Sequence, residues 1–454
     1  MTDTLVGGVD TDPNPAPDQP ASCGVSSWLA SVERMHVTDD FLSFLSLSPS
    51  SYHAADTVAR RLIHEGFVRQ DESAAWDATP GGHVLVRGGA VIAWWVPENA
   101  SPDSGFRIIG SHTDSPGFKL KPRGDLQSHG WQQAGVEVYG GPIYASWLDR
   151  ELSLAGRIAL CDGSVKLVNT GAILRIPHVA IHLDRTVNSN LTLNPQQHLQ
   201  PVFAVGDPDV SIMDVLAEAA GVEPYDIIAH DLITVDTQVP EIFGAHGDFI
   251  AAGRLDNLSS VQPSMTALIA AARSEDAGDD ILVLAAFDHE EVGSNSTTGA
   301  GGPLLEDALI RTARALGADE DERRRMFTRS TMVSADAAHS IHPNHAGKHD
   351  PVNHPIIGQG PVLKVNANQR YTSDAVTSGM WIRACQSAGV PHQVFAGRND
   401  VPCGSTIGPI SATRLGIASV DVGIPLLSMH SAREMAGVKD LGWFEKALEA
   451  YLVN

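Results

Sequence analysis

Two adjacent carboxylates, Glu290 and Glu291, stand close behind an apolar run at residues 281–286. A run of this length, bounded by charged residues, predicts a strand that is buried on both faces. Its carboxyl end would deliver two acids into a crevice, where like charges repel and lose hydration unless a cation compensates them. The pair therefore indicates a metal ion together with a proton-transfer base. A solvated turn between a strand and a helix is the structural alternative.

Further ligand-type residues stand at other predicted strand ends and loops: His112, Asp256, Asp336 and His430. In an α/β sheet such ends lie along one crevice, so residues that are distant in sequence can meet there. Asp114 could accept the free ring N–H of His112 and orient the imidazole. A structural role for His112 and a helix N-cap role for Asp256 are the alternatives. Oxygen and imidazole ligands without thiolate suit zinc, manganese or cobalt, and one carboxylate can bridge two ions.

The elements that would position these residues alternate between strand and helix. We predict an α/β fold, a mixed sheet covered by helices, formed by residues 37–122 and 246–454. Residues 123–245 contain short β-like pieces with glycine turns, which predicts an inserted β-rich domain. Residues 1–36 are rich in Pro, Asp, Gly and Ser without a sustained period, which predicts a disordered leader.

The periodicity predicts individual elements within this division. Helices are expected near residues 41–45, 53–63, 212–220, 261–272, 304–316, 373–388 and 443–452. Strands are expected at residues 84–86, 91–96, 106–110, 281–286, 331–334 and 362–365.

The charge balance of the chain limits its partners. The 454 residues contain 31 basic and 54 acidic residues, and the resulting formal charge of -23 opposes binding to nucleic acid or to an anionic membrane surface. Its four cysteines are scattered without a C-x-x-C spacing, so neither a disulfide framework nor a thiolate zinc site is indicated. No signal sequence or membrane span is apparent, and we expect a cytoplasmic protein.

Five ordered blocks that carry these residues resemble the signature blocks of the aspartyl aminopeptidase family: residues 111–116, 254–257, 288–294, 334–339 and 429–434. The resemblance covers roughly residue 37 to the end. It implies a peptidase with two divalent metal ions, zinc or alternatively manganese or cobalt, and a bridging water as nucleophile. The implied metal ligands are His112, Asp256 as the bridge, Glu291, Asp336 and His430. Glu290 would be the general base, and Asp114 would orient His112.

The family resemblance also implies a substrate, a peptide with an N-terminal Asp or Glu. The segment at residues 364–371 resembles the family's substrate-contacting segment, which implies contacts from Lys364 and Tyr371, with His339 from a neighbouring block. Without the resemblance, Lys364 is more typical of an edge strand that it protects from aggregation. The His-rich loop from His339 to His354 could bind another metal, but its irregular spacing favours a polar loop.

A segment of the inserted domain, residues 175–185, resembles part of the family's oligomerisation domain. The histidine that matches His182 contacts substrate in a neighbouring subunit's active site in that family, which implies a closed homo-oligomer, a dodecamer by resemblance. The alternative from the residues alone is that His178 and His182 lie on one face of an interface segment.

Other function classes have weaker support in the sequence. There is no G-x-S-x-G motif, and Cys403 has no identifiable histidine partner, so nucleophilic catalysis is unsupported. The glycines at 299–302 lack the lysine of a phosphate-binding loop. The rival hypotheses are a different dimetal amidohydrolase, such as a deacylase, and a catalytically silent scaffold. A scaffold would be expected to have lost Glu290 or a ligand, and none is missing.

Overall fold

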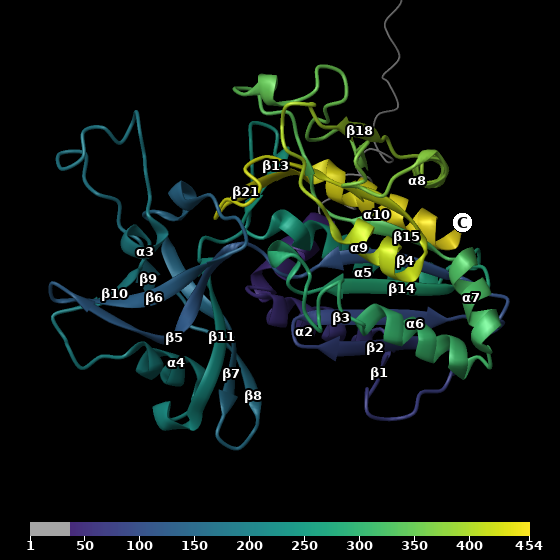
Figure 1. The fold of residues 1–454 in the computed structure, drawn as a ribbon, viewed down its shortest axis with the longest axis horizontal. Coiled ribbons are helices and arrows are strands. Elements are labelled where there is room, and N and C mark those ends of the chain that lie inside the picture. Colours follow the sequence, from purple (N-terminus) through teal and green to yellow (C-terminus); the bar gives the residue numbers. More distant parts are fainter. Residues whose placement is uncertain (1–36) are drawn as a thin grey trace, which may run out of the picture.

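The computed structural model describes residues 37–454, which form two parts that lie side by side (Figure 1). The larger part contains a nine-stranded sheet with the spatial order β1 (Val68–Arg69), β2 (Gly81–Arg87), β3 (Ala90–Val96), β14 (Ile281–Phe287), β4 (Phe106–His112), β15 (Thr331–Ala335), β19 (Ala418–Gly423), β17 (Val362–Val365) and β18 (Gln393–Ala396). Strands β14, β4, β15 and β19 are parallel, whereas the β2–β3, β3–β14 and β17–β19 pairs are antiparallel. The predicted mixed sheet is therefore confirmed.

The central strands of this sheet are covered on both faces. All residues of β14 are buried, and in β4 only Arg107 is partly exposed. The unbroken apolar run that predicts β14 is typical of parallel strands in such a layered fold. In the register of the two strands, Phe287 of β14 lies opposite His112 of β4. The carboxyl ends of neighbouring strands therefore meet at one edge of the sheet.

Two groups of helices cover the sheet. Alternate residues of β2 and β3 contribute to two separate apolar cores, one on each face. The first core packs against residues 37–47, which are helical, and against α2 (Ser51–His64), α5 (Leu255–Ala272), α8 (Ala375–Ser387) and α10 (Val438–Val453). The second packs against α6 (Leu304–Ala315), α7 (Glu320–Arg329) and α9 (Ile407–Leu415). The predicted covering of the sheet by helices is confirmed.

The sequence pattern does not predict helices α7 and α9. Helix α7 buries only Met326 and Phe327, so its apolar stripe is too narrow to show a helical period. Helix α9 begins with Ile407-Gly408-Pro409, which reads as a loop. The Thr406 side chain nevertheless accepts a hydrogen bond from the backbone N–H of Gly408 and caps this helix.

The smaller part is a β-rich domain with a seven-stranded sheet. Its spatial order is β11 (Ile227–Asp236), β5 (Gly117–Ser128), β6 (Trp131–Tyr139), β10 (Val202–Val205), β9 (Leu174–Arg175), β7 (Glu151–Leu160) and β8 (Val165–Asn169). Because β11 pairs with both β5 and β7, this sheet closes into a barrel. The predicted helix at 212–220 is present as α4 (Ile212–Ala220). The additional β-rich domain is confirmed, whereas its limits at 123 and 245 stay a prediction.

Two small sheets join segments that are distant in the chain. One contains β12 (Glu241–Phe243), β13 (Phe249–Ala252) and β21 (Glu434–Gly437), and the other contains β16 (Ala338–His339) and β20 (Pro425–Leu426). The loop between β20 and β21 carries His430. Within residues 37–454, no helix combines the length and apolar character needed to cross a membrane. The leader predicted at residues 1–36 lies outside the described residues.

Candidate metal centre

Three neighbouring strands deliver ligand-type residues to one edge of the nine-stranded sheet. His112 is the last residue of β4, which lies between β14 and β15. Glu290 and Glu291 follow β14, and Asp336 directly follows β15. Because the three strands are parallel, their carboxyl ends open into the same crevice.

A tight turn after β14 directs both adjacent glutamates into the crevice. Residues Glu290–Val292 form a single 3₁₀ turn, flanked by His289 with a φ of 65° and Gly293 with a φ of 95°. In an extended strand adjacent side chains would point to opposite faces, so the turn is what brings the carboxylates together. Glycine adopts this left-handed conformation without a steric penalty, which explains its use at position 293.

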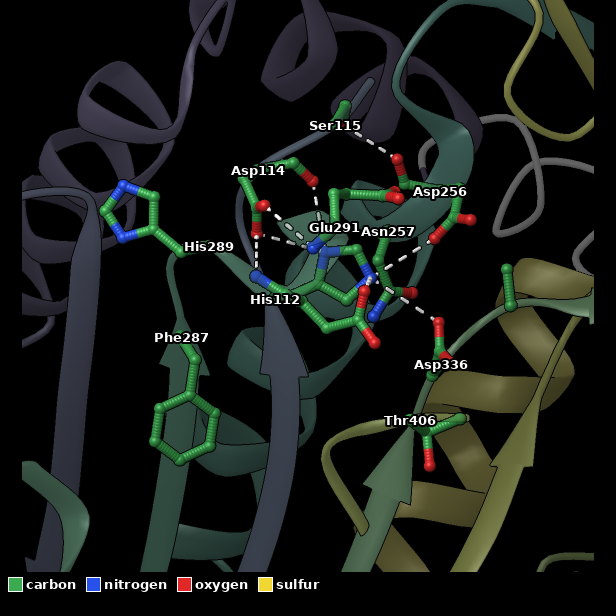
Figure 2. A network of polar contacts seen from close by, with 12 residues as sticks. His112, Asp114, Ser115, Asp256, Asn257, Phe287, His289, Glu291, Asp336 and Thr406 are labelled. Atoms are coloured by element: carbon green, nitrogen blue, oxygen red, sulfur yellow. Dashed lines mark hydrogen bonds and ion pairs between the residues drawn. The ribbon is translucent and has the colours of Figure 1, made fainter. Parts of the chain in front are cut away.

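The ligand-type side chains converge in three groups, of which two share Asp256 and the third joins His112 to Glu290 and Glu291. Figure 2 shows the contacts of His112 with Asp256 and Asp336, which belong to the first of the two groups that share Asp256. In the first group, Nε2 of His112 lies 3.3 Å from Oδ1 of Asp256 and 3.5 Å from Oδ1 of Asp336. In the second, Nε2 of His430 lies 3.3 Å from Oδ2 of Asp256 and 3.4 Å from Oε2 of Glu291. Each oxygen of Asp256 thus faces a different histidine, as expected of a carboxylate that can bridge two ions.

The hydrogen-bonding state of these carboxylates tests whether a metal fits. Oδ1 of Asp256 and Oε1 of Glu291 are buried and accept no hydrogen bond from any of residues 37–454. A buried ionised oxygen without a donor costs free energy, which a coordinated cation would offset. Imidazole nitrogens and carboxylate oxygens without thiolate form a donor set that suits zinc, manganese or cobalt. The residues present therefore fit a divalent metal centre.

Burial and the crowding of charge shift the pKa values in this centre. Burial opposes protonation of His112, but the surrounding carboxylates raise its pKa well above the ordinary value. Asp256 and Glu291 outweigh burial at His430 and raise its pKa to about 10. Burial raises the pKa of Glu290 to about 7, and burial with repulsion from Asp256 raises the pKa of Glu291. Without a cation, this cluster therefore retains protons.

Asp114 is a buried carboxylate that organises the turn after β14. Its Oδ1 accepts a hydrogen bond from the backbone N–H of Glu290 at 3.0 Å, and its Oδ2 accepts one from Glu291 at 3.1 Å. The hydroxyl of Tyr139 donates a third bond at 2.8 Å. Nδ1 of His112 lies 3.0 Å from the main-chain oxygen of Asp114 and 3.4 Å from Oδ1. Asp114 thus contacts both the ring of His112 and the backbone of the glutamate pair.

His430 is held by two residues that the sequence analysis did not single out. Its Nδ1 lies 3.1 Å from the main-chain oxygen of Gly141, and its backbone N–H donates to Oε1 of Glu434 at 2.8 Å. Gly141 and Tyr139 belong to the β-rich domain, so this domain supports the centre directly. In the sequence, the only signal for Tyr139 and Gly141 is a predicted strand that ends in two glycines. Glu434 belongs to the same sequence block as His430.

A cavity of about 430 Å³ adjoins the centre, and its lining includes His430, His339 and Tyr371. The ring of Tyr371 is buried, whereas His339 is exposed and its ring centroid lies 5.9 Å from that of Phe395. Basic side chains also line this cavity: His342, Lys348, His349 and Arg398. The predicted substrate-contacting residues His339 and Tyr371 therefore share one cavity beside the candidate ligands.

Lys364 occupies a position between this cavity's Tyr371 and the metal centre. It is 1% exposed, and its Nζ donates to the main-chain oxygens of Asp336 at 2.8 Å and Ala337 at 3.2 Å. The same Nζ lies 3.3 Å from Oδ2 of Asp336 and 5.1 Å from the ring centroid of Tyr371. Strand β17, which carries Lys364, lies between β19 and β18 and is not an edge strand. The edge-strand alternative for Lys364 is therefore wrong.

Two predicted features lie outside the centre within this chain. His182 is exposed on the connection between β9 and α3 (Pro195–His198), which projects from the barrel (Figure 1). The histidines of the loop after β16 do not assemble into a metal-binding group among residues 37–454. The interpretation of that segment as a polar loop stays a prediction.

Comparison with known proteins identifies the family. The model of the family described as aminopeptidase I zinc metalloprotease (M18) matches residues 44–452. The chain belongs to the M18 aminopeptidase family. This M18 aminopeptidase is 47% identical over 419 residues to a protein of Streptomyces coelicolor named probable M18 family aminopeptidase 2, covering 91% of this chain and 97% of that protein. A protein of the same name from Streptomyces avermitilis is 48% identical with the same coverage.

Solved structures agree with this family assignment. The structure described as the complex of Ape4 and Nbr1 contains a chain that is 35% identical to this M18 aminopeptidase, with a TM-score of 0.90. The match covers 93% of this chain and 86% of that chain. The mApe1 dodecamer of S. cerevisiae is 26% identical with a TM-score of 0.81, covering 92% of this chain and 97% of that chain. The predicted family and fold are confirmed by these matches.

Proposed function

We propose that this M18 aminopeptidase uses two divalent metal ions, zinc or alternatively manganese or cobalt, to release acidic residues from the N-termini of peptides. The observation that carries the proposal is the pair of ligand groups that share Asp256, with one of its oxygens facing His112 and the other facing His430. His112 and Asp336 would complete one ion's ligand set, and Glu291 and His430 the other's. Glu290 belongs to neither of these two groups, although it also forms a third candidate group with His112 and Glu291.

Glu290 is the residue that would move the proton. When bound, the two ions would supply Lewis-acid polarisation of the scissile carbonyl and lower the pKa of water. Oε2 of Glu290 lies 4.0 Å from Nε2 of His112, so its carboxylate reaches the same space as the candidate ligands. It would take a proton from the attacking water and transfer it to the leaving amine. Asp114 would keep Glu290 in place, because its carboxylate accepts a hydrogen bond from the backbone N–H of Glu290.

The proposed preference for N-terminal Asp or Glu rests on the basic character of the adjoining cavity. In a chain with a formal charge of -23, the wall of this cavity carries Lys348, the imidazoles of His339 and His342, and Arg398, whose guanidinium is paired with Asp400 at 2.6 Å. Desolvation within the cavity lowers the pKa of His339, so its imidazole would act there as a neutral donor. A side-chain carboxylate would be favoured there by charge-assisted hydrogen bonds. Tyr371 would contribute a hydroxyl from the same wall, and Lys364 would act from its buried position beside Asp336.

We further propose that the active protein is a homo-oligomer, with the dodecamer as the expected form. The segment around His182 exposes apolar side chains that a second copy would cover, since Val179 is 56% exposed, Ile181 50% and Leu183 83%. A similar solved structure is described as a dodecamer. His182 would then reach substrate in a neighbouring subunit. The three free cysteines among the described residues are consistent with the proposed cytoplasmic location.

A substrate panel tests the proposal against its closest rival. Metal-depleted protein would be reconstituted with zinc, manganese or cobalt and assayed with chromogenic Asp, Glu, Leu and Ala derivatives that have a free amino group. The N-acetyl forms of the same compounds form the deacylase arm. We expect metal-dependent turnover with a higher kcat/KM for Asp and Glu. Turnover of only the N-acetyl compounds, or full activity in protein shown to be metal-free, would contradict the proposed function.

A further inference from the structure

Glu434 is a buried acid that joins the backbones of two candidate metal ligands. It is 2% exposed and stands at the start of β21. Its Oε1 accepts a hydrogen bond from the backbone N–H of His430 at 2.8 Å, and its Oε2 accepts one from the backbone N–H of Asp256 at 3.0 Å. Both of its oxygens are thus engaged by residues that the proposed function assigns to the metal ions.

We infer that Glu434 is a positioning residue of the metal centre, which holds Asp256 and His430 at the separation that lets them share an ion. The two residues arrive from unrelated parts of the chain, the first turn of α5 and the loop between β20 and β21. Nε2 of His430 lies 3.3 Å from Oδ2 of Asp256, but both side chains would turn to a metal ion when the ion is bound. The backbone bonds to Glu434 do not depend on the ion and so persist in either state.

The local backbone explains why such a support is needed. His430 has a φ of 67°, and Arg254, two residues before Asp256, has a φ of 63°. Both are non-glycine residues in the left-handed region, which is disfavoured by contact between Cβ and the backbone. These conformations persist only where surrounding interactions over-determine them. The bidentate acceptance by Glu434 is one such interaction, and it acts on both ligand-bearing segments at once.

The role of Glu434 parallels that of Asp114, which also joins the backbones of two residues of the centre. Asp114 accepts from the backbone N–H groups of Glu290 and Glu291, and Glu434 accepts from those of Asp256 and His430. Among residues 37–454, no lysine, arginine or histidine side chain forms a salt bridge with the Glu434 carboxylate. The two ligand backbones are therefore its hydrogen-bonding partners in the described part of the chain.

Asp440 provides a matched control because it makes the same kind of contact away from the centre. It is 0% exposed, and its carboxylate accepts hydrogen bonds from the backbone N–H groups of Gly358 at 2.7 Å and Gly360 at 2.9 Å. Asp440→Asn and Glu434→Gln each replace one acceptor oxygen by an amide nitrogen that faces a backbone donor. Both variants should lose stability, but only Glu434→Gln alters a support of the candidate ligands.

The experiment compares metal binding by the full-length wild type, Glu434→Gln and Asp440→Asn. Each protein would be stripped of metal and titrated with Co²⁺, with visible absorption to report the ligand field and chelator competition to measure affinity. We expect Glu434→Gln to bind Co²⁺ about 10- to 100-fold more weakly with an altered absorption spectrum. Asp440→Asn should keep the affinity and spectrum of the wild type.

Each outcome of this titration shows whether Glu434 positions the metal ligands or only stabilises the fold. Wild-type affinity and spectrum in Glu434→Gln would overturn the positioning role. If Glu434→Gln does not fold, Glu434→Asp decides, because it keeps both acceptors but withdraws them by one methylene. Unchanged Co²⁺ binding by Glu434→Asp would then overturn the inference, and weakened binding supports it. The inference rests on the proposed metal centre. If the wild type does not bind Co²⁺, both the metal centre and the role of Glu434 are overturned. If the wild type binds Co²⁺, the result for the Glu434 variants tests the role of Glu434 alone.

Discussion

The carboxylate of Asp114 accepts a hydrogen bond from the backbone N–H of Glu290 at 3.0 Å. The bond fixes Glu290 through its main chain and leaves its side chain free beside the candidate ligands. A substitution of the Glu290 side chain should therefore preserve the turn. Because the backbone of Glu290 holds the turn and its side chain would carry the proton, a side-chain substitution can test the proposed role.

Replacement of Glu290 by glutamine should remove proton transfer without removing metal. We expect Glu290→Gln to lose about three or more decades of kcat, because general acid–base catalysis contributes roughly 10²- to 10⁴-fold and water activation depends on it. Elemental analysis should find the metal content of the wild type. A parallel loss of metal in this variant would instead identify Glu290 as a ligand.

Removal of the metal should lower both activity and stability. Chelation leaves the carboxylates of Asp256, Glu291 and Asp336 close together without a compensating cation, and we expect turnover to cease. Zinc, manganese or cobalt should restore it. At a free metal concentration 100 times the Kd, linkage predicts stabilisation of about 2.7 kcal/mol, measurable as a higher Tm. An unchanged Tm and unchanged turnover after verified metal removal would exclude this centre.

Replacement of Lys364 by methionine distinguishes substrate selection from support of Asp336. If Lys364 contacts substrate, Lys364→Met should narrow the kcat/KM preference for Asp and Glu over Leu and Ala by roughly 1.5 to 3 kcal/mol. Because Nζ lies 3.3 Å from Oδ2 of Asp336, the variant should also be tested for metal affinity. Weaker metal binding with unchanged discrimination would make Lys364 a support, with His339 and Tyr371 the next candidates for selection.

Mixed oligomers test whether His182 completes a neighbouring subunit's site. His182→Ala and Glu290→Ala should each be inactive alone. Co-refolding should produce sites that combine an intact Glu290 from one chain with an intact His182 from another, so activity should return. Mass measurement would establish that mixed assemblies form. Mixed assemblies as inactive as either parent would refute the shared site.

Acidification should destabilise the fold through His53, which is remote from the candidate ligands in sequence. Burial lowers its pKa from 6.5 to about 4, and its Nδ1 lies 2.8 Å from Oγ of Ser50. His53 therefore binds a proton more readily in the unfolded chain than in the folded protein. The contribution of His53 to the free energy of unfolding, which is complete above pH 6.5, should fall by up to about 3 kcal/mol as the pH approaches 4. The difference in unfolding free energy between the wild type and His53→Gln should decrease over this window. A pH-independent difference would contradict the shifted pKa.

The sequence by itself determined the layered α/β part and the location of its candidate ligands along the chain. The unbroken apolar run of β14 required burial on both faces, and the acids that follow it had to stand at a strand end. The charged helix α7 was not predicted, because its few buried apolar residues do not show a helical period in the sequence. The family resemblance supplied the roles of individual residues, since spacing alone left a structural alternative open for each of them.

Only the tertiary structure decided how these residues are supported. It placed Lys364 against Asp336, Gly141 of the β-rich domain against His430, and Glu434 between two ligand-bearing segments. Such contacts join residues separated by up to 289 positions, and many of them use backbone N–H and carbonyl groups that every residue type carries. Residue identity therefore holds little information about them. They exist because strand register, barrel closure and left-handed turns bring particular backbone groups within hydrogen-bonding distance.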